Sequence, residues 1–525
     1  MSLYLALLAC RRSPPDENTA TPDPTESTAP APDTNSTETG TTAHHPLGCD
    51  LAHVELDVTN EPPLLDAASY TTRIVGAANS WTGASSAVIR NPAGDGGELA
   101  VGAVGDKIIG TFYDHTYAPS ILLAFHLPLA PGSVDFADAD IALLPEREVD
   151  GEYSDAEALH LRTGDLTGDG WDDLVVVGMS WGWGHVYVLP SPLPAGGGFL
   201  PVVASTGVKS VIDHFYLASV YDWNADGMDD LGLGYSGGGL AGQPPGGAMV
   251  YLSPLPADIT TGRDTDALFD VSALDDPLGQ GSGTWSILIP DVDADGAADI
   301  LVEGNAWTDI APYDGFSALQ FEGGFALFSG NQYGRHALGE ERAIIYAECD
   351  PSLGFPVVVG DVTGDGVEDV ALPGALAAVN GEARGALWIL SRLGSVAGQV
   401  SLTEASDAVI IGHGPTSSAR FAGITSLVDL DGDGYGDLAV SDTSARAVYV
   451  FLGPLSGFID TWEADLQIVE SDPAAVFFGA SLSAGDVDLD GTPDLIIGDY
   501  LATYGGAEAG AVTIMSGASL LAAMN

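Results

Sequence analysis

The sequence predicts an all-β fold, a seven-bladed β-propeller with calcium-binding strand–loop–strand motifs that follows a disordered linker. An aspartate-rich motif recurs about every 66 residues, and short apolar runs rich in β-branched residues flank each clear copy. No segment of helical period and useful length intervenes. Four short strands in each period are typical of a propeller blade. We expect an N-terminal signal at 1–10, a linker at 11–48 and the propeller at 49–525.

The first ten residues read MSLYLALLAC, and the apolar stretch from Leu3 to Ala9 resembles a secretory signal. The run that ends at Cys10 resembles the lipobox of bacterial lipoproteins, which implies that Cys10 is lipidated. No Lys or Arg precedes the apolar stretch, so a misplaced start at Met1 and an incidental apolar terminus are alternatives. We expect an exported protein, lipid-anchored at the outer membrane or cell surface, with a secreted or periplasmic protein as the alternative.

Residues 11–48 consist almost entirely of Pro, Thr, Ser, Ala, Asp, Glu and Asn. Such a segment cannot bury enough apolar area to offset its ordering entropy, so we expect it to be disordered. A flexible tether between an anchored Cys10 and a folded body would explain both features. One acyl chain holds a protein only marginally on a membrane, and the lipoprotein resemblance implies a multiply acylated Cys.

The recurring motif has the form Asp-x-[Asp/Asn/Thr]-x-Asp-Gly-x-x-Asp, and six copies are clear. Ca²⁺ prefers six to eight oxygen ligands in a flexible cage, which side chains at positions one, three, five and nine of a tight loop can supply. Glycine at position six permits the sharp turn. An EF-hand would need Glu at position twelve, where every copy has an apolar residue. The candidate ligands are Asp165, Thr167, Asp169, Asp173, Asp222, Asn224, Asp226, Asp230, Asp291, Asp293, Asp295, Asp299, Asp361, Thr363, Asp365, Asp369, Asp429, Asp431, Asp433, Asp437, Asp486, Asp488, Asp490 and Asp494.

The alternative is that these loops are ordinary Asp-Gly turns, because Asp, Asn and Gly favour turns without any metal. Six copies with three or four carboxylates each favour Ca²⁺, since unbound carboxylates would repel one another at close range. We predict about six Ca²⁺ sites, with tighter binding by the loops that start at Asp291, Asp429 and Asp486 and carry four aspartates. A seventh copy, from Asn91 to Glu98, is one residue short and poor in carboxylates, so we expect no metal there.

The chain ends can complete a ring, because the residues after Asp486 and those from Cys49 to Arg90 together match one period. With the aromatic-Gly entries at Phe477–Gly479 and Phe421–Gly423, the motif resembles the FG-GAP repeat. This resemblance covers roughly residues 70–525 and implies the seven-bladed propeller of integrin alpha chains and many bacterial surface proteins. Closure would remove exposed sheet edges, with the N-terminal segment pairing near the C-terminal blade.

The composition limits the partners. The chain has 525 residues and a formal net charge of −59, which excludes a nucleic-acid binder that works by neutralising phosphates. Hydrophobic residues make up 46% of the chain, enough for a core. Three Cys exclude a disulfide-dense scaffold. A bridge between Cys49 and Cys349 would require the N-terminal segment to cross a propeller face, because the two Cα atoms must come within about 7 Å.

Catalytic motifs are weak. Gly178–Gly182 and Gly234–Gly238 fit the G-x-S-x-G pattern, but both follow a repeat strand and have no predicted helix after them. His160 and His214 precede calcium loops and are expected to be strand or turn residues.

We predict a monomeric binding or adhesion scaffold for a surface protein or polysaccharide, with membrane contact only through Cys10. The alternatives are a purely structural envelope component and a carbohydrate-binding or hydrolytic propeller with a site at the central axis, for which Trp171, Trp181 and Trp183 are candidates.

Overall fold

The computed structural model describes residues 50–51, 61–78, 80–91, 96–103, 121–144, 159–180, 183–195, 198–200, 204–209, 214–236, 246–260, 265–270, 286–304, 324–337, 339–346, 353–374, 377–380, 382–413 and 421–525. Cys10 and the predicted signal and linker lie outside the described residues. The fold described below belongs to the compact unit from Gly48 to Asn525.

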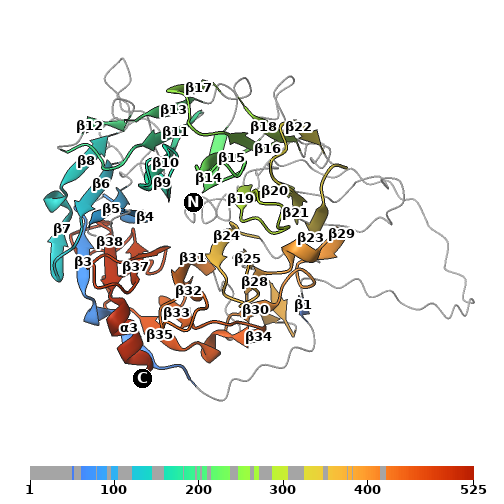
Figure 1. The fold of residues 1–525 in the computed structure, drawn as a ribbon. Helices are drawn as coiled ribbons and strands as arrows, with labels where there is room; N and C mark the ends of the chain where they lie inside the picture. Colours follow the sequence, from blue (N-terminus) through green and yellow to red (C-terminus); the bar gives the residue numbers. More distant parts are fainter. Residues whose placement is uncertain are drawn as a thin grey trace, which may run out of the picture. The chain divides into compact units, whose positions relative to one another are not determined.

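Seven antiparallel sheets of four strands form the blades within the described residues, which confirms the predicted propeller (Figure 1). Numbered along the chain, the first three blades contain β4 (Thr82–Arg90), β5 (Gly97–Ala103), β6 (Ile121–His126) and β8 (Ile141–Leu144); β9 (Leu159–Gly164), β10 (Asp173–Ser180), β11 (Trp183–Leu189) and β13 (Thr206–Lys209); β14 (His214–Tyr221), β15 (Asp230–Ser236), β16 (Gly247–Tyr251) and β18 (Ala267–Asp270).

Blades four to six contain β19 (Ile287–Ile289), β20 (Asp299–Gly304), β21 (Gly324–Phe328) and β23 (Ala343–Tyr346); β24 (Val357–Gly360), β25 (Asp369–Gly374), β28 (Ala386–Leu390) and β30 (Ala408–Ile411); β31 (Phe421–Val428), β32 (Asp437–Asp442), β33 (Ala447–Phe451) and β35 (Leu466–Val469). Blade seven combines both ends of the chain, with β36 (Ser481–Gly485), β37 (Asp494–Asp499), β38 (Ala511–Met515) and β3 (Thr72–Val75).

Each blade gains a fifth, parallel strand from the next blade along the ring. This strand lies between the third and fourth strands of its own blade and pairs with the fourth strand of the preceding one. In blade order, the added strands are β12 (Gly198–Phe199), β17 (Asp258–Thr260), β22 (Gly334–Ala337), β29 (Gly398–Ser401), β34 (Gly457–Asp460), β2 (Leu64–Asp66) and β7 (Gly132–Asp135). These pairings tie neighbouring blades together at the outer edge of the ring.

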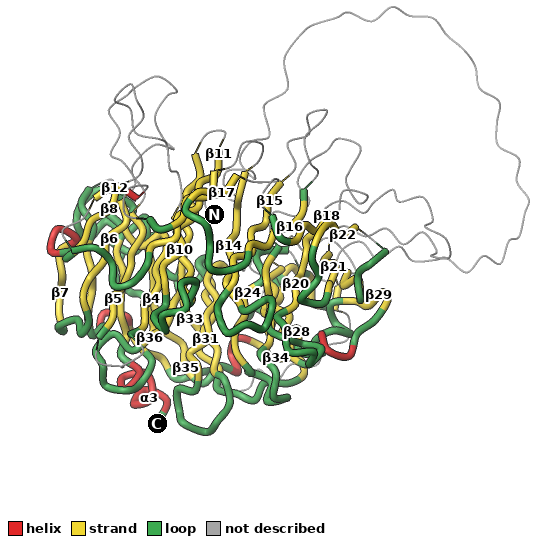
Figure 2. Tube along the Cα trace, turned by 45° about the horizontal axis from the view of Figure 1, so that its top comes forward, coloured by secondary structure: helices red, strands yellow, loops and turns green. Residues whose placement is uncertain are grey.

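Short helices complete the description. They are η1 (Ala67–Ser69), η2 (Phe136–Asp138), η4 (Leu393–Ser395), η5 (Thr461–Glu463) and α3 (Gly517–Met524). The strands run between two faces of the ring, and α3 lies at the edge of one of them (Figure 2). Within the described residues, none of the helices has the length and apolar composition that a membrane span requires.

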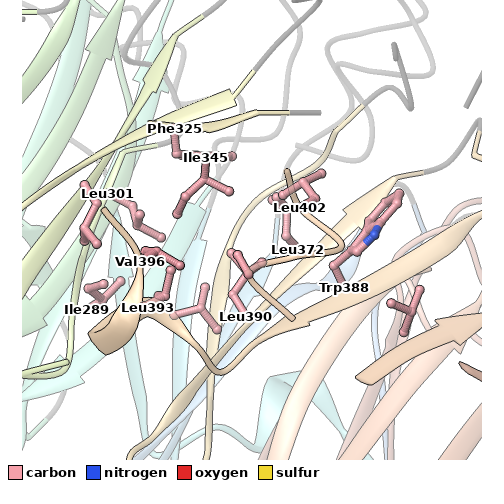
Figure 3. Close-up of a cluster of buried hydrophobic side chains, with 14 of the residues drawn as sticks. Ile289, Leu301, Phe325, Ile345, Leu372, Trp388, Leu390, Leu393, Val396 and Leu402 are labelled. Atoms are coloured by element: carbon pink, nitrogen blue, oxygen red, sulfur yellow. The ribbon is translucent and has the colours of Figure 1, made fainter. Parts of the chain in front are cut away.

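The hydrophobic core lies between the blades. Second strands such as β20 and β25 are buried along their whole length, because both faces of each blade pack against a neighbour. Between blades four and five, for example, Ile289 and Leu301 pack with Leu372 and Trp388 (Figure 3). This arrangement explains why the strand after each loop is a continuous apolar run rather than an alternating one.

The ring closes as predicted, because the N-terminal strand β3 pairs antiparallel with the C-terminal strand β38 (Figure 1). Arg73 of β3 bonds Glu470, which follows β35 in blade six, with Nη2 and Oε2 2.6 Å apart. The guanidinium lies between the rings of Tyr70 and Tyr504, 4.3 and 4.4 Å from their centroids. The hydroxyl of Tyr504 also donates to Glu470. A buried ion pair therefore joins the two ends of the chain to blade six.

The N-terminal segment reaches blade five before it joins blades six and seven. Here β1 (Asp50–Leu51) pairs with β26 (Ala378–Val379), which also pairs with β27 (Glu382–Ala383). Leu353, which precedes β24, forms a bridge with Gly374 of the same blade. Cys49 and Cys349 lie outside the described residues. A bridge between them stays a prediction, although Asp50 and Leu51 pair with Ala378 and Val379 of blade five.

Candidate metal centres

All six aspartate-rich loops lie on one face of the ring. Each loop joins the first strand of a blade to the second, as the loop after Gly164 joins β9 to β10. Since equivalent strands of the blades run in the same direction around the ring, equivalent loops emerge at the same face. We name the loops by their first residue: loops 165, 222, 291, 361, 429 and 486.

The aspartate at position nine is the buried anchor of every loop. These six side chains, at most 1% exposed, begin the second strands and are Asp173, Asp230, Asp299, Asp369, Asp437 and Asp494. In each of the six, one carboxylate oxygen accepts a hydrogen bond from the backbone N–H of position two or three, such as Val487 at 2.9 Å from Asp494. In five of them the other oxygen accepts from the backbone N–H of the second residue after the third strand, such as Gly517.

Burial raises the pKa of these position-nine carboxyls. The pKa values of Asp230, Asp299 and Asp369 rise to about 7, and those of Asp437 and Asp494 rise to about 6. Desolvation is the largest cause, backbone hydrogen bonds oppose it, and the neighbouring loop carboxylates add to it. A cation in the loop would lower these pKa values again, since a nearby positive charge favours the ionised form.

The exposed half of each loop is a tight turn around the position-one carboxylate. In loop 165, the Asp165 carboxylate accepts hydrogen bonds from the amides of Gly168, Asp169 and Gly170. Glycine at position six has a left-handed φ in all six loops, between 88° and 97°. This confirms the predicted reason for glycine at that position, because L side chains rarely adopt such angles.

Three loops gather carboxylates closely enough for one ion. The three clusters are Asp291, Asp293 and Asp295; Asp429, Asp431 and Asp437; and Asp486, Asp488 and Asp494. In each cluster the candidate ligand atoms lie within 4.8 Å of one another. Oxygens bound to one Ca²⁺ at 2.3–2.6 Å can be at most about 5 Å apart, so this spacing fits the ion. These are the same three loops that carry four aspartates.

The clusters differ from the predicted ligand sets in one respect, because each holds three of its loop's four aspartates. Asp433 and Asp490, at position five, stay outside their clusters, and each accepts the amide of position seven. In loop 291 the position-nine Asp299 stays outside, and Asp293 also contacts the hydroxyl of Ser329 and the guanidinium of Arg342. Arg342 supplies positive charge that competes with a metal, which no local sequence pattern indicates.

Loops 165, 222 and 361 do not bring three carboxylates together within the described residues. Each has Thr or Asn at position three, and in loops 222 and 361 this side chain bonds within the loop. The Asn224 amide donates to Asp226, and the Thr363 hydroxyl donates to Asp369. The ligand assignments at Asp165, Thr167, Asp169, Asp173, Asp222, Asn224, Asp226, Asp230, Asp361, Thr363, Asp365 and Asp369 therefore stay predictions.

The degenerate seventh loop is two residues shorter than the others, not one as its sequence indicated. Arg90 pairs with Gly97, whereas the corresponding residues Gly164 and Asp173 enclose two more positions. Gly97 therefore occupies the place of the position-nine aspartate. The guanidinium of Arg90 bonds Asp172 of the neighbouring loop, with Nε and Oδ2 2.7 Å apart. A side-chain cation thus lies beside the loop that lacks the ligands for a metal.

The motifs that fit G-x-S-x-G lie in the blades. Ser180 and Ser236 end the second strands β10 and β15, and the next described element is in both cases the third strand of the same blade. His160 lies within β9 and His214 begins β14, as expected for strand residues. The Trp181 candidate lies outside the described residues. Within the described residues, no helix follows either strand as a nucleophile elbow would require.

One polar cluster that the repeat does not predict lies at the opposite face, where the fourth strand β30 ends. His413 and Arg384 both bond the buried carboxylate of Asp460, and the imidazole stacks on Trp462 with ring centroids 3.7 Å apart. Asp460 also accepts the amide of Trp462 and caps η5. With its carboxylate buried and fully bonded, the cluster joins blades five and six at the ring's periphery and does not converge on the central axis.

Comparison with known proteins agrees with this fold. Residues 478–515, which contain loop 486 and its flanking strands, match the FG-GAP repeat family. Integrin alpha-PS2 of Drosophila melanogaster is 34% identical over 165 residues, which are 28% of this chain and 11% of that protein. Integrin alpha-PS5 of the same organism is 35% identical over 154 residues, which are 28% of this chain and 15% of that protein.

Among solved structures, the Dos1 propeller aligns over 85% of this chain and 95% of its own, with 10% identity and a TM-score of 0.44. By contrast, the chain spans only 11% and 15% of the lengths of the two integrins it matches. The molecule contains an FG-GAP repeat in an integrin alpha-like seven-bladed propeller, with three aspartate clusters that could hold metal ions.

Proposed function

We propose that this protein is an exported surface scaffold whose propeller is stabilised by Ca²⁺ and presents a binding or adhesion surface. The observation that carries the proposal is the set of three carboxylate clusters at equivalent places in the ring, one of them inside the segment that matches the FG-GAP repeat. The similarity to two integrin alpha chains supports a binding role by analogy.

Magnitudes favour a structural role for the ions. Extracellular Ca²⁺ modules have dissociation constants of about 0.1–1 mM. At about 1 mM Ca²⁺ and a constant near 0.1 mM, each site would stabilise the fold by about 1.4 kcal/mol. Each ion would also neutralise carboxylates in a chain of net charge −59. The role proposed for Ca²⁺ is therefore to hold the blade ends together.

The proposal includes a lipid anchor at Cys10 that places the propeller at the outer membrane or cell surface, with residues 11–48 as a tether. The proposed partner is a surface protein or polysaccharide, bound by a monomeric propeller. Metabolic labelling with a fatty acid would test the anchor. We expect label in the wild-type chain and none in Cys10→Ser, and labelling of both chains would contradict the anchor.

Elemental analysis tests the metal sites. We expect several Ca²⁺ per chain in excess of the buffer after equilibrium dialysis against about 1 mM Ca²⁺, and one fewer in Asp431→Asn. This variant keeps the acceptor oxygen for the Asp433 amide but removes one ligand charge of loop 429. Asp465→Asn is the matched control, because Asp465 lies in the same blade and outside the loops. A metal-free wild-type protein, or an equal ion count in Asp431→Asn, would contradict the assignment.

A pull-down from surface extracts tests the scaffold role. We expect the immobilised chain to retain specific partners in Ca²⁺ and to lose them in EGTA, because removal of the ions loosens the loops on this face of the ring. Recovery of the same partners in both conditions would separate the function from the metal.

A further inference from the structure

We propose that the calcium loops are energetically coupled through backbone hydrogen bonds between neighbouring blades, in two separate series. Loops 165, 222 and 291 form one series, and loops 361 and 429 form the other. This inference rests on the proposed binding of Ca²⁺ by the loops. It adds a regulatory property, cooperative binding, that follows from contacts between loops rather than within them.

The coupling contact has the same form at three junctions. The carbonyl of position one in one loop accepts the backbone N–H of position eight in the next. Asp229 donates to Asp165 at 3.0 Å, Ala298 to Asp222 at 3.1 Å, and Gly436 to Asp361 at 2.8 Å. Each bond therefore joins the first ligand residue of one loop to the residue directly before the last ligand of the next.

Side chains strengthen two of these junctions. A Cβ at Gly168 of loop 165 would lie 2.9 Å from the sulfur of Met228, and a Cβ at Gly364 of loop 361 would lie 2.7 Å from the ring of Tyr435. Met228 and Tyr435 both occupy position seven of the following loop. At the first junction the Asp229 carboxylate also accepts the amide of Asp165, so that the two loops exchange hydrogen bonds.

The contact is missing at two junctions, and one absence has an evident cause. Position eight of loop 486 is Pro493, which has no N–H to donate to loop 429. Between loops 291 and 361, Glu368 occupies position eight, and the described residues show no backbone bond from it to Asp291. These two junctions separate the two series and leave loop 486 outside both.

A bound ion would order its loop and fix the backbone amide at position eight of that loop. This amide donates to the carbonyl of position one in the preceding loop and so restrains the preceding loop as well. The neighbour then has less conformational entropy to lose when it binds its own ion, which is positive coupling. Coupling free energies between sites are typically 1–3 kcal/mol, equivalent to about 5–150-fold in affinity. Because coupling is reciprocal, the loss of one ion should weaken the sites on both sides of it.

Two matched variants test this. Asp226→Asn disables loop 222 in the middle of the first series, and Asp488→Asn disables loop 486 outside both series. Each removes one candidate ligand charge, and asparagine keeps the oxygen that accepts the amide of Met228 or of Asp490. In a Ca²⁺ titration against a competing chelator, we expect each variant to bind one ion fewer. Only Asp226→Asn should also weaken two further sites, by about fivefold or more.

A second variant acts on the contact itself. Ala298→Pro removes the donor between loops 222 and 291 without changing a ligand, and native Pro493 shows that position eight accepts proline. We expect it to retain the wild-type ion count with reduced cooperativity. If both asparagine variants leave the remaining affinities unchanged, and Ala298→Pro does not alter the titration, the coupling is wrong although the calcium sites stand. A wild-type chain that binds no Ca²⁺ would refute the proposed function itself.

Discussion

The buried ion pair at the ring closure offers the sharpest test of how this fold is held together. Arg73→Met removes the guanidinium that bonds Glu470 at 2.6 Å and lies between two tyrosine rings. The Glu470 side chain is fully buried, so the substitution leaves a buried carboxylate without its countercharge. Breaking a buried pair from one side costs about 3–5 kcal/mol, and the lost cation–π contacts add about 0.5–1 kcal/mol each. We expect a loss of about 4–7 kcal/mol in unfolding free energy.

Urea denaturation in excess Ca²⁺, followed by far-UV circular dichroism, measures this loss. Arg73→Met with Glu470→Gln should recover a large part of the stability, because the double variant leaves no unpaired charge. Arg392→Met is the control, since Arg392 and Asp407 form an exposed pair whose loss should cost less than about 1 kcal/mol. If Arg73→Met costs no more than Arg392→Met, or if the double variant recovers nothing, the ion pair does not secure the closure as we argue.

Three further predictions concern the loops. Removal of Ca²⁺ should lower the unfolding temperature seen by calorimetry, and an unchanged temperature would argue against a structural role for the ions. In metal-free buffer, stability should rise as the pH falls from 8 to 5, because the pKa values of Asp230 and Asp299 are raised to about 7 in the folded state, which therefore binds more protons than the unfolded state. With Ca²⁺ the same acidification should destabilise the protein, since protons displace the metal; the same sign in both buffers would contradict this. Gly364→Ala should destabilise more than Gly366→Ala, because both have a left-handed φ but only a Cβ at Gly364 would meet Tyr435; equal losses in denaturation would show that Tyr435 does not pack there.

The local features of the fold could be predicted because their causes lie within a few residues. The nine-residue motif contains the left-handed glycine at position six, and its aspartates bond amides two to seven residues away. The β-branched runs after each loop are long enough only for short buried strands. Their regular recurrence predicts equal blades, and equal blades predict a ring.

Contacts between blades decided the rest, because they join residues that no local pattern relates. Arg73 and Glu470 are 397 residues apart in sequence, and the crossing of β1 to blade five depends on a pairing with Ala378 and Val379. The short seventh loop could be measured only from the register of β4 against β5. Which three carboxylates meet in a loop, and which loops bond one another, likewise follow from how the neighbouring backbones approach. Composition and spacing determined the kind of blade that this chain repeats. The packing of one blade on the next determined which side chains meet. That packing depends on many weak contacts between residues far apart in the sequence, which no single segment contains.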